Sequence, residues 1–419
     1  MFYFATTTGQ IGACSEAKGL IDITKGQNGV QQFFEPFPPA HYNVYDVSKD
    51  GKLSLETKKQ FHSFVDDPLH WKYQRIQLEK GFDCETVKKN IRTLFCSAVK
   101  KRLMSSRKLG SLLSGGLDSS LVAAIAAGEI KKENSSLKLP TFSIGMGQSP
   151  DVIAARKVAA HIGSEHHEVT ITEDEGLQAV DDVIYALESY DVTTVRASTP
   201  MYLLAKYISN ETDTIVIMSG EGADELAQGY IYFHKQPSPE EGDKESKRLL
   251  TDLYMYDVLR TDRSTASHGL EVRAPFLDHA FTSYFLSLPA DMRMPKDGME
   301  KHLVRSAFDG TGLLPNEILW RSKEAFSDGV SSRKKSWYEI LQDHIEDKVT
   351  DEQMENAAQT FPHNTPRSKE AYYYRSVFEN RFGSKLAKLI PYQWMPKWIE
   401  CDDPSARVLS HYKNDEEAK

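Results

Sequence analysis

The stretch LGSLLSGGLDSSLVAAI, residues 109–125, predicts a strand, a tight turn and a helix in succession. Residues 109–113 are short and mostly apolar, which suits a buried strand. The apolar positions after residue 116 recur at helical spacing, and Gly128 is the expected end of that helix. The glycines therefore lie where a strand passes into a helix. Because the first N–H groups of a helix lack partners within it and carry the positive end of its dipole, this turn is a candidate anion site.

The composition is that of a globular protein of 419 residues, long enough for two domains. A net charge of −9 argues against a nucleic-acid-binding surface. No apolar run approaches the about 20 residues of a membrane helix, and the opening MFYFATTTGQ lacks the regions of a signal peptide. The cysteines lack CxxC spacing, which indicates reduced thiols in a cytoplasmic protein rather than disulfides or a zinc site: Cys14, Cys84, Cys96 and Cys401.

The pattern of elements divides the chain into four regions. Residues 1–60 contain short β-prone runs broken by turn residues, and residues 61–83 form a polar linker. Residues 84–400 alternate strands with helices and then become mostly helical, and residues 401–419 form a polar tail. This alternation predicts an α/β fold with a doubly wound parallel sheet, helices on both of its faces and a helical C-terminal part. Ligands of such sheets bind at the carboxyl ends of the strands.

Local signals delimit single elements in the third region. Ser149 and Pro150 predict the start of a helix, and Gly163 predicts its end. We expect an exposed loop at QPSPEEGDKESKR, residues 236–248, and a loop between helices at DVTTVRAST, residues 191–199.

The turn SGGLDSS, residues 114–120, lacks the Lys that a Walker A loop places after its last glycine. A cradle of N–H groups and hydroxyls remains, suited to a leaving pyrophosphate, and Asp118 could hold Mg²⁺ through its carboxylate. The alternative is a helix start that serines cap and glycines allow to pack closely.

Three further segments carry charged groups. SGEGADE, residues 219–225, follows a buried strand, and its three acids require a metal ion or a basic side chain nearby unless the turn is simply solvated. Lys323 in WRSKEAFSDG lies among aromatic residues and is either a site residue or a surface residue. The segment 191–199 offers two hydroxyls and Arg196, which could bind a carboxylate or cap the following helix.

Taken together, these motifs resemble the glutamine-hydrolysing asparagine synthetases, which belong to the PP-loop ATP pyrophosphatases. LLSGGLDSS resembles the pyrophosphatase fingerprint. The ordered series that extends the resemblance over almost the whole chain comprises DVTTVRAST, SGEGADE, GYIYFHK, GLEVRAPFLDH, EKHLVR and WRSKEAFSDG.

The resemblance implies a fold of the PP-loop, adenine nucleotide alpha hydrolase-like type and a two-step reaction. The aspartate β-carboxylate attacks the α-phosphorus of Mg·ATP, giving β-aspartyl-AMP and pyrophosphate, and ammonia then displaces AMP to form asparagine. By this resemblance, Glu221 is the general base toward ammonia and Lys323 stabilises the transition state at phosphorus. The resemblance places Arg196, Thr193 and Thr194 near the intermediate and pyrophosphate. Asp257 and Glu225 match acids that hold these charged site residues in place. Pyrophosphate contacts fall on Ser114, Gly115, Gly116, Asp118 and Ser119, adenosine contacts on Leu112, Ile144, Ser219 and Gly220, and Mg²⁺ ligands on Asp118 and Asp224.

One departure concerns the nitrogen donor. The family's glutaminase domain precedes the synthetase domain, and its nucleophile is a cysteine exposed by removal of the initiator Met. Here Phe2 follows Met1, and GQIGACSEAKGL resembles only the last part of that domain. Cys14 has no free α-amine beside it. We therefore expect aspartate, ATP and ammonia as the small-molecule substrates, with glutamine used only by full-length relatives, and a homodimer as a candidate assembly.

The same departure predicts that residues 1–60 are a remnant of a sheet sandwich with unpaired edges. Such a remnant packs on the synthetase domain, pairs with another chain or is poorly ordered.

Two rival interpretations stay open. The first is another PP-loop ligase, such as a β-lactam synthetase, although the segments TTVRAST and WRSKEAFSDG favour the asparagine branch. The second is a catalytically weak paralogue that acts as a binding or dimerisation partner, which only the missing half-domain supports.

Overall fold

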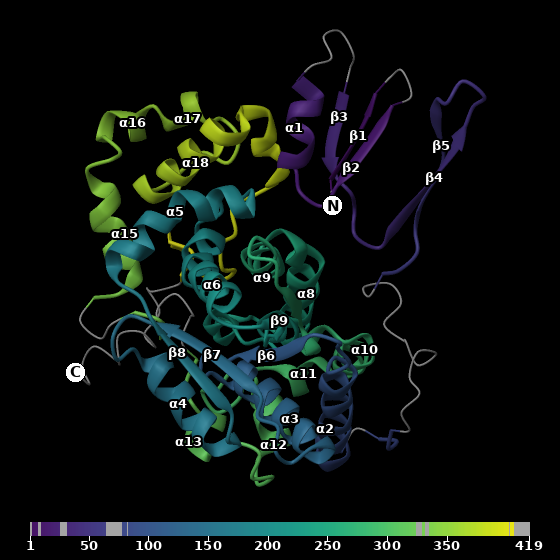
Figure 1. Ribbon diagram of the computed structural model, residues 1–419, viewed down its shortest axis with the longest axis vertical. Coiled ribbons are helices and arrows are strands. Elements are labelled where there is room, and N and C mark those ends of the chain that lie inside the picture. Colours follow the sequence, from purple (N-terminus) through teal and green to yellow (C-terminus); the bar gives the residue numbers. More distant parts are fainter. Residues whose placement is uncertain are drawn as a thin grey trace.

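The computed structural model describes residues 2–6, 10–25, 32–63, 78–81, 83–323, 329–331, 335–401 and 403–405. At its centre is a parallel five-stranded sheet with strand order β10-β9-β6-β7-β8 (Figure 1). The strands are β6 (Lys108–Leu112), β7 (Pro140–Gly145), β8 (Glu165–Thr170), β9 (Thr214–Met218) and β10 (Glu271–Arg273). The chain runs outward from β6 through β7 to β8 and then returns to lay β9 on the other side of β6. A crevice therefore opens between the carboxyl ends of β6 and β9, where such sheets bind ligands.

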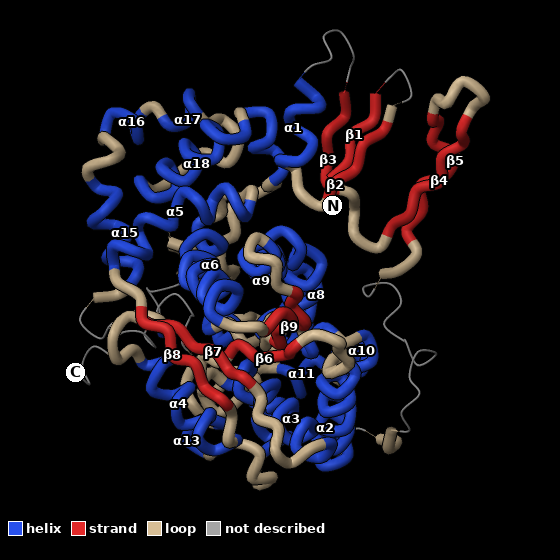
Figure 2. Tube along the Cα trace, viewed as in Figure 1, coloured by secondary structure: helices blue, strands red, loops and turns tan. Residues whose placement is uncertain are grey.

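Helices cover both faces of this sheet, as Figure 2 shows. One face carries α2 (Cys84–Lys101), α3 (Leu117–Glu133), α4 (Pro150–Ile162), α10 (His279–Ser287), α12 (His302–Phe308) and α13 (Asn316–Leu319). The other carries α5 (Glu173–Leu187), α6 (Val192–Glu211), α15 (Trp337–Glu346) and α18 (Lys369–Phe382). Further helices of this part of the chain are α7 (Ala223–Leu226), α8 (Pro239–Asp252), α9 (Asp257–Ala266), α11 (Ala290–Arg293), α16 (Asp351–Glu355) and α17 (Ala357–Thr360). The predicted doubly wound α/β architecture is confirmed.

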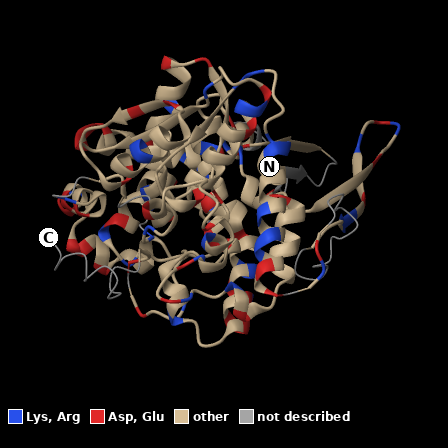
Figure 3. Ribbon diagram, turned by 90° about the horizontal axis from the view of Figure 1, so that it is seen from below, with Lys and Arg blue, Asp and Glu red and all other residues tan. Residues whose placement is uncertain are grey.

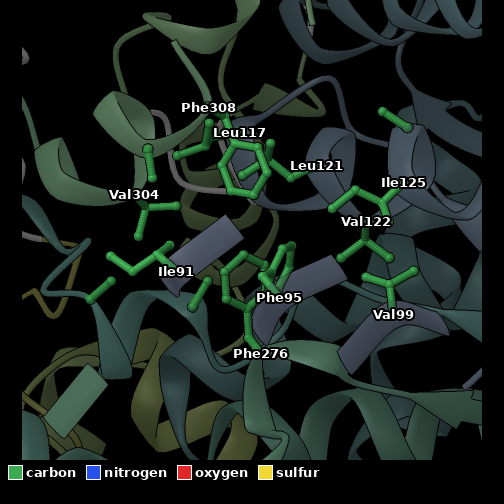
Figure 4. Packing of buried hydrophobic residues seen from close by; sticks show 14 of the residues in the cluster. Ile91, Phe95, Val99, Leu117, Leu121, Val122, Ile125, Phe276, Val304 and Phe308 are labelled. Atoms are coloured by element: carbon green, nitrogen blue, oxygen red, sulfur yellow. The ribbon is translucent and has the colours of Figure 1, made fainter. Parts of the chain in front are cut away.

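An aromatic and aliphatic core holds α2, α3 and α12 together (Figure 4). Phe95 lies at its centre, with its ring 4.2 Å from that of Phe276 and 6.2 Å from that of Phe308. Leu117 and Leu121 of α3 are buried in the same cluster. Since burying each such side chain stabilises the fold by about 1.5–3 kcal/mol, this packing fixes the start of α3, which forms part of the crevice.

The N-terminal region contains two small antiparallel sheets, in the order β2-β1-β3 and β4-β5. Its elements are β1 (Phe2–Thr6), β2 (Ile11–Cys14), α1 (Lys18–Lys25), β3 (Gln32–Pro36), β4 (His41–Val47) and β5 (Leu53–Gln60). The backbone N–H groups of Ala17 and Lys18 donate to the Glu188 carboxylate, and Arg263 pairs with Glu16. Residues 16–18 therefore pack against the body formed by the third region.

The β4–β5 hairpin extends from the body and carries charges of both signs near its tip (Figure 3). The predicted linker, residues 61–83, lies largely outside the described residues. Among the helices that the structure describes, none combines the length and the apolar composition of a membrane-spanning segment.

Several predicted boundaries are confirmed and three expectations are wrong. Ser149 caps α4, Pro150 is its first residue, and Gly163 ends it in the left-handed conformation. However, α3 continues past Gly128 to Glu133, because the helix remains packed through Ile130 beyond the glycine. The expected loop at 236–248 forms most of α8, and the expected loop at 191–199 is the first part of α6.

Candidate active site

The loops that follow β6 and β9 meet at the carboxyl edge of the sheet. A Cβ on Gly220 would lie 2.7 Å from the Ser119 backbone nitrogen, and one on Gly115 would lie 2.4 Å from the Ala155 nitrogen. Gly115 also has φ of +76°, which L side chains rarely adopt. Glycine is therefore needed at both positions, because the backbones approach one another too closely for a side chain.

The N-terminus of α3 faces this crevice without a side-chain cap. Gly116 occupies the N-cap position and has no capping hydrogen bond. The serine hydroxyls are instead tied together within the turn, since the Ser114 nitrogen donates to Ser119 Oγ at 3.2 Å and the two Oγ atoms are 3.1 Å apart. This arrangement favours the anion cradle over the alternative in which serines cap the helix.

A single pocket collects most of the residues that the sequence analysis selected. Its inner wall includes apolar side chains, among them Phe142, Met201 and Leu204, beside Leu112 and Ile144, which suits a purine base. Gly115 and Thr194 are not part of its lining. The predicted residues that line it are Leu112, Ser114, Gly116, Asp118, Ser119, Ile144, Thr193, Arg196, Ser219, Gly220, Glu221, Asp224, Glu225, Asp257 and Lys323.

Two lysines neutralise the carboxylates at the phosphate end of the pocket. Lys323 Nζ lies 2.8 Å from Asp224 Oδ2, and Lys301 Nζ contacts both Asp118 Oδ2 and, at 2.7 Å, Asp224 Oδ1. Although burial opposes it, Lys301 and Lys323 together hold the pKa of Asp224 well below its usual range. Burial by itself would lower the pKa of Lys323, but the negative charges of Asp224 and Asp118 raise it above its usual value. Asp224 of SGEGADE therefore has the basic partners that the clustering of acids required.

The donor set fits a hard divalent cation. Asp118 Oδ1 is buried and has no hydrogen-bond partner among the described residues. Within that part of the chain, no group of three or more His, Cys, Asp or Glu side chains could hold a metal ion. Mg²⁺ needs no such group, because proteins commonly bind it through one or two carboxylates together with substrate phosphates. Asp118 and Asp224 are suitably placed for that mode.

A second cluster of charges lies beyond Glu221. Arg260 Nη2 is 2.6 Å from Glu221 Oε2 and 3.0 Å from Asp257 Oδ1. Tyr230 Oη lies 2.6 Å from Glu225 Oε1 and 2.7 Å from Asp257 Oδ2. Burial and the neighbouring Asp257 raise the pKa of Glu225. Tyr230 Oη therefore bridges Glu225 and Asp257 and ties the two carboxyl groups together.

Arg196 lines the pocket from the first turns of α6, with its charge already paired. Its guanidinium donates to Glu370 at 3.0 and 2.7 Å and to Asp403 at 3.4 and 2.8 Å. Pro404 and Ser405 also line the pocket, so this pair attaches the described start of the polar tail to the site. At the start of α6, Asp191 is the N-cap residue, and its Oδ1 accepts from the Thr194 backbone N–H and from the hydroxyls of Thr193 and Thr194.

The sequence analysis missed three features of this pocket. Lys301 joins Asp118 to Asp224, and its only sequence signal was its place in the motif EKHLVR. Arg260, which contacts Glu221 and Asp257, was not selected by the sequence analysis. Finally, Arg321 Nη2 donates to Asp151 Oδ1 at 2.9 Å and so fixes the segment that carries Lys323 against α4.

Comparison with known proteins agrees with this geometry. A sequence model of the family described as asparagine synthase matches residues 90–249 and 237–400. The chain belongs to the asparagine synthase family. The reaction of this family, ATP-dependent formation of asparagine, is a carbon–nitrogen ligation. Curated relatives named asparagine synthetase [glutamine-hydrolyzing] from Gallus gallus and Homo sapiens are 58% and 56% identical over 415 residues, which cover 99% of this chain and 74% of each relative.

Two solved structures of synthetases with other names show a more distant likeness to this chain. The NMN synthetase of Francisella tularensis has 14% identity and a TM-score of 0.33, and covers 74% of this chain and 98% of its own. An NH3-dependent NAD synthetase from Campylobacter jejuni has 17% identity and a TM-score of 0.24, and covers 43% of this chain and 77% of its own.

Proposed function

We propose that this chain activates aspartate with ATP and transfers ammonia to the activated carboxyl group. In the first step, an oxygen of the aspartate β-carboxylate attacks the α-phosphorus and the bond to the bridging oxygen of pyrophosphate breaks. In the second step, ammonia attacks the acyl carbon, a carbon–nitrogen bond forms, one proton leaves the nitrogen and AMP departs. The products are asparagine, AMP and pyrophosphate.

One observation carries this proposal: the uncapped start of α3, the SGEGADE loop and Lys323 converge on one pocket. The uncapped N–H groups and Ser119 suit the pyrophosphate, and the apolar wall near Ile144 suits the base. Lys323 is held beside Asp224 at the same end, where negative charge develops during displacement at phosphorus.

Glu221 is the group assigned to proton removal from the attacking nitrogen. Its side chain is 18% exposed, and burial raises its pKa despite the opposing charge of Arg260. A carboxylate with a raised pKa is a stronger base at neutral pH, as this role requires. When bound, Mg²⁺ would be held by Asp118 and Asp224 and would supply positive charge beside the phosphate oxygens.

Ammonia is the proposed nitrogen donor for the site in this chain. No cysteine is among the described residues that line the pocket. Cys14 lies in β2 against α1, since a Cβ on Gly19 would meet its sulfur at 2.6 Å. Because no thiol lines the described part of the pocket, we assign the nitrogen of the product to ammonia that is supplied. The cysteines among the described residues are free thiols, which supports the proposed cytoplasmic location.

The test is aspartate-dependent exchange between ATP and pyrophosphate, followed by asparagine formation with either ammonium or glutamine. We expect exchange with aspartate, and asparagine with ammonium only. Lys323→Ala should abolish exchange, whereas Lys348→Ala, at an exposed lysine outside the pocket, should retain it. Absence of exchange in the unmodified chain would support the weak-paralogue interpretation. Equal rates from glutamine and ammonium would refute the assignment of the nitrogen donor alone.

A further inference from the structure

The C-terminal part of the described chain follows the start of α6 to the pocket. The Trp394 N–H donates at 3.1 Å to Oδ2 of Asp191, the residue that caps α6. Further into the same helix, Arg196 donates to Asp403. The turn formed by residues 403–405, the 403–405 turn below, therefore lies beside Arg196, and its last two residues line the pocket.

The charge of Arg196 is matched by groups of the chain itself. Its Nε and Nη2 donate to Glu370, and its Nη1 and Nη2 donate to Asp403, so two carboxylates face one guanidinium. The centroid of the Tyr338 ring lies 4.9 Å from Cζ of the same guanidinium. A guanidinium with two carboxylate partners has little charge left for a phosphate group. Arg196 is therefore placed to hold the 403–405 turn.

The 403–405 turn bridges the rim and the interior of the pocket. The side chain of Asp403 is 29% exposed, whereas that of Arg196 is 3% exposed. Pro404 is buried and lines the pocket with Ser405, whereas Asp403 does not line it. The backbone N–H and the hydroxyl of Ser405 both donate to Asp403 Oδ1. One carboxylate at the rim thus closes the turn and fastens it to Arg196.

A wall at this place matters for the activated carboxyl group of the proposed reaction. Attack by ammonia at the acyl carbon gives asparagine. Attack by water at the same carbon would form a carbon–oxygen bond, break the bond to AMP and return aspartate with release of protons. ATP would then be consumed without product. Enzymes prevent such hydrolysis of reactive intermediates by excluding water from the site.

We propose that the 403–405 turn is a wall that keeps water from the activated carboxyl group, and that Asp403 is the positioning residue that holds this wall through Arg196. This inference rests on the proposed function, because that reaction places the activated carboxyl group in the pocket. Asp403 takes no part in either bond-making step. Aspartate-dependent pyrophosphate exchange should therefore survive its replacement, whereas the coupling of ATP use to asparagine formation should weaken.

The test measures AMP and asparagine together in the full chain, with saturating ATP and aspartate and limiting ammonium. The unmodified chain should form the two products in nearly equal amounts. In Asp403→Asn, the excess of AMP over asparagine should rise by about tenfold, given the strength of hydrogen bonds to charged groups. In water enriched in the heavy oxygen isotope, label should enter the side-chain carboxylate of aspartate, which identifies attack at the acyl carbon.

Other variants separate the wall from a general loss of structure. Asp403→Glu keeps the carboxylate and should restore most of the coupling. Asp347→Asn is the matched control, at an exposed carboxylate outside the pocket lining, and should couple as the unmodified chain does. Ser405→Ala removes the hydroxyl bond to Asp403 and should raise the excess of AMP less. It replaces Asp403→Asn if that variant does not fold.

The outcomes distinguish this inference from the proposed function. An unmodified chain without aspartate-dependent exchange would refute the proposed function and the wall with it. An active unmodified chain whose folded Asp403→Asn variant keeps the ratio of AMP to asparagine, with no label in aspartate, would overturn the wall alone. Loss of exchange in that folded variant would place Asp403 in the catalytic machinery and would also overturn the proposal.

Discussion

Replacing Gly115 by alanine would test whether the close approach of the β6 loop to α4 shapes the phosphate cradle. Gly115 has φ of +76°, and a Cβ there would lie 2.4 Å from the Ala155 nitrogen and 2.5 Å from the Ala154 carbonyl carbon. These are backbone atoms of α4, which cannot move away as the end of a flexible side chain can. The loop or the helix must therefore shift.

The expected cost has two parts. A left-handed backbone costs an L-residue about 1–2 kcal/mol, and forcing atoms into a packed site costs about 1–3 kcal/mol more. Gly115→Ala should thus lower the free energy of unfolding by about 2–5 kcal/mol. Gly147→Ala should cost only about 1–2 kcal/mol, because Gly147 has φ of +59° with no atom within 4 Å of its Cβ position.

Urea unfolding of both variants separates strain from the steric clash, and pyrophosphate exchange reports on the cradle. We expect exchange to fall sharply in Gly115→Ala and to persist in Gly147→Ala. Gly116→Ala, whose Cβ would meet only Ser114 Oγ at 3.3 Å, should cost less than about 1 kcal/mol as a change of N-cap residue. Equal stability losses in the Gly115 and Gly147 variants would show that the loop relaxes freely, which would refute the reasoning.

Three other perturbations test the supports of the pocket. Asp151→Asn removes the charge that holds Arg321 and should slow exchange by up to about tenfold, measured as kcat at saturating ATP. Glu370→Gln leaves buried Arg196 with one carboxylate partner, Asp403, and should cost up to about 3 kcal/mol in urea unfolding, and an unchanged midpoint would contradict this. Burial lowers the pKa of His166, so the unfolded chain binds more protons and stability falls as pH drops below about 6.5; His166→Gln should flatten this dependence between pH 7.5 and 5.5.

The sequence alone was sufficient to predict the strand–turn–helix at residues 109–125, the caps of α4 and the parallel sheet. The strand–turn–helix and the caps depend on interactions between near neighbours in the chain, such as the Ser149 side chain with the Val152 nitrogen. The parallel sheet follows instead from the alternation of strands with helices along the chain. The placement of the two loops at one edge followed from the same information, because carboxyl ends of parallel strands share an edge. The start of α8 was also available, since Ser238 and Pro239 form a capping signal that the sequence analysis passed over.

Only the tertiary structure decided which charges pair. Lys301 meets Asp118 and Arg196 meets Glu370 across more than 170 intervening positions of the chain. A charged residue in a sequence has no periodic signal that names its partner, because an ion pair depends on the final packing of distant elements. The ion pair of Arg260 with Glu221 is of the same kind, because it exists only where folding brings α9 beside the loop that follows β9.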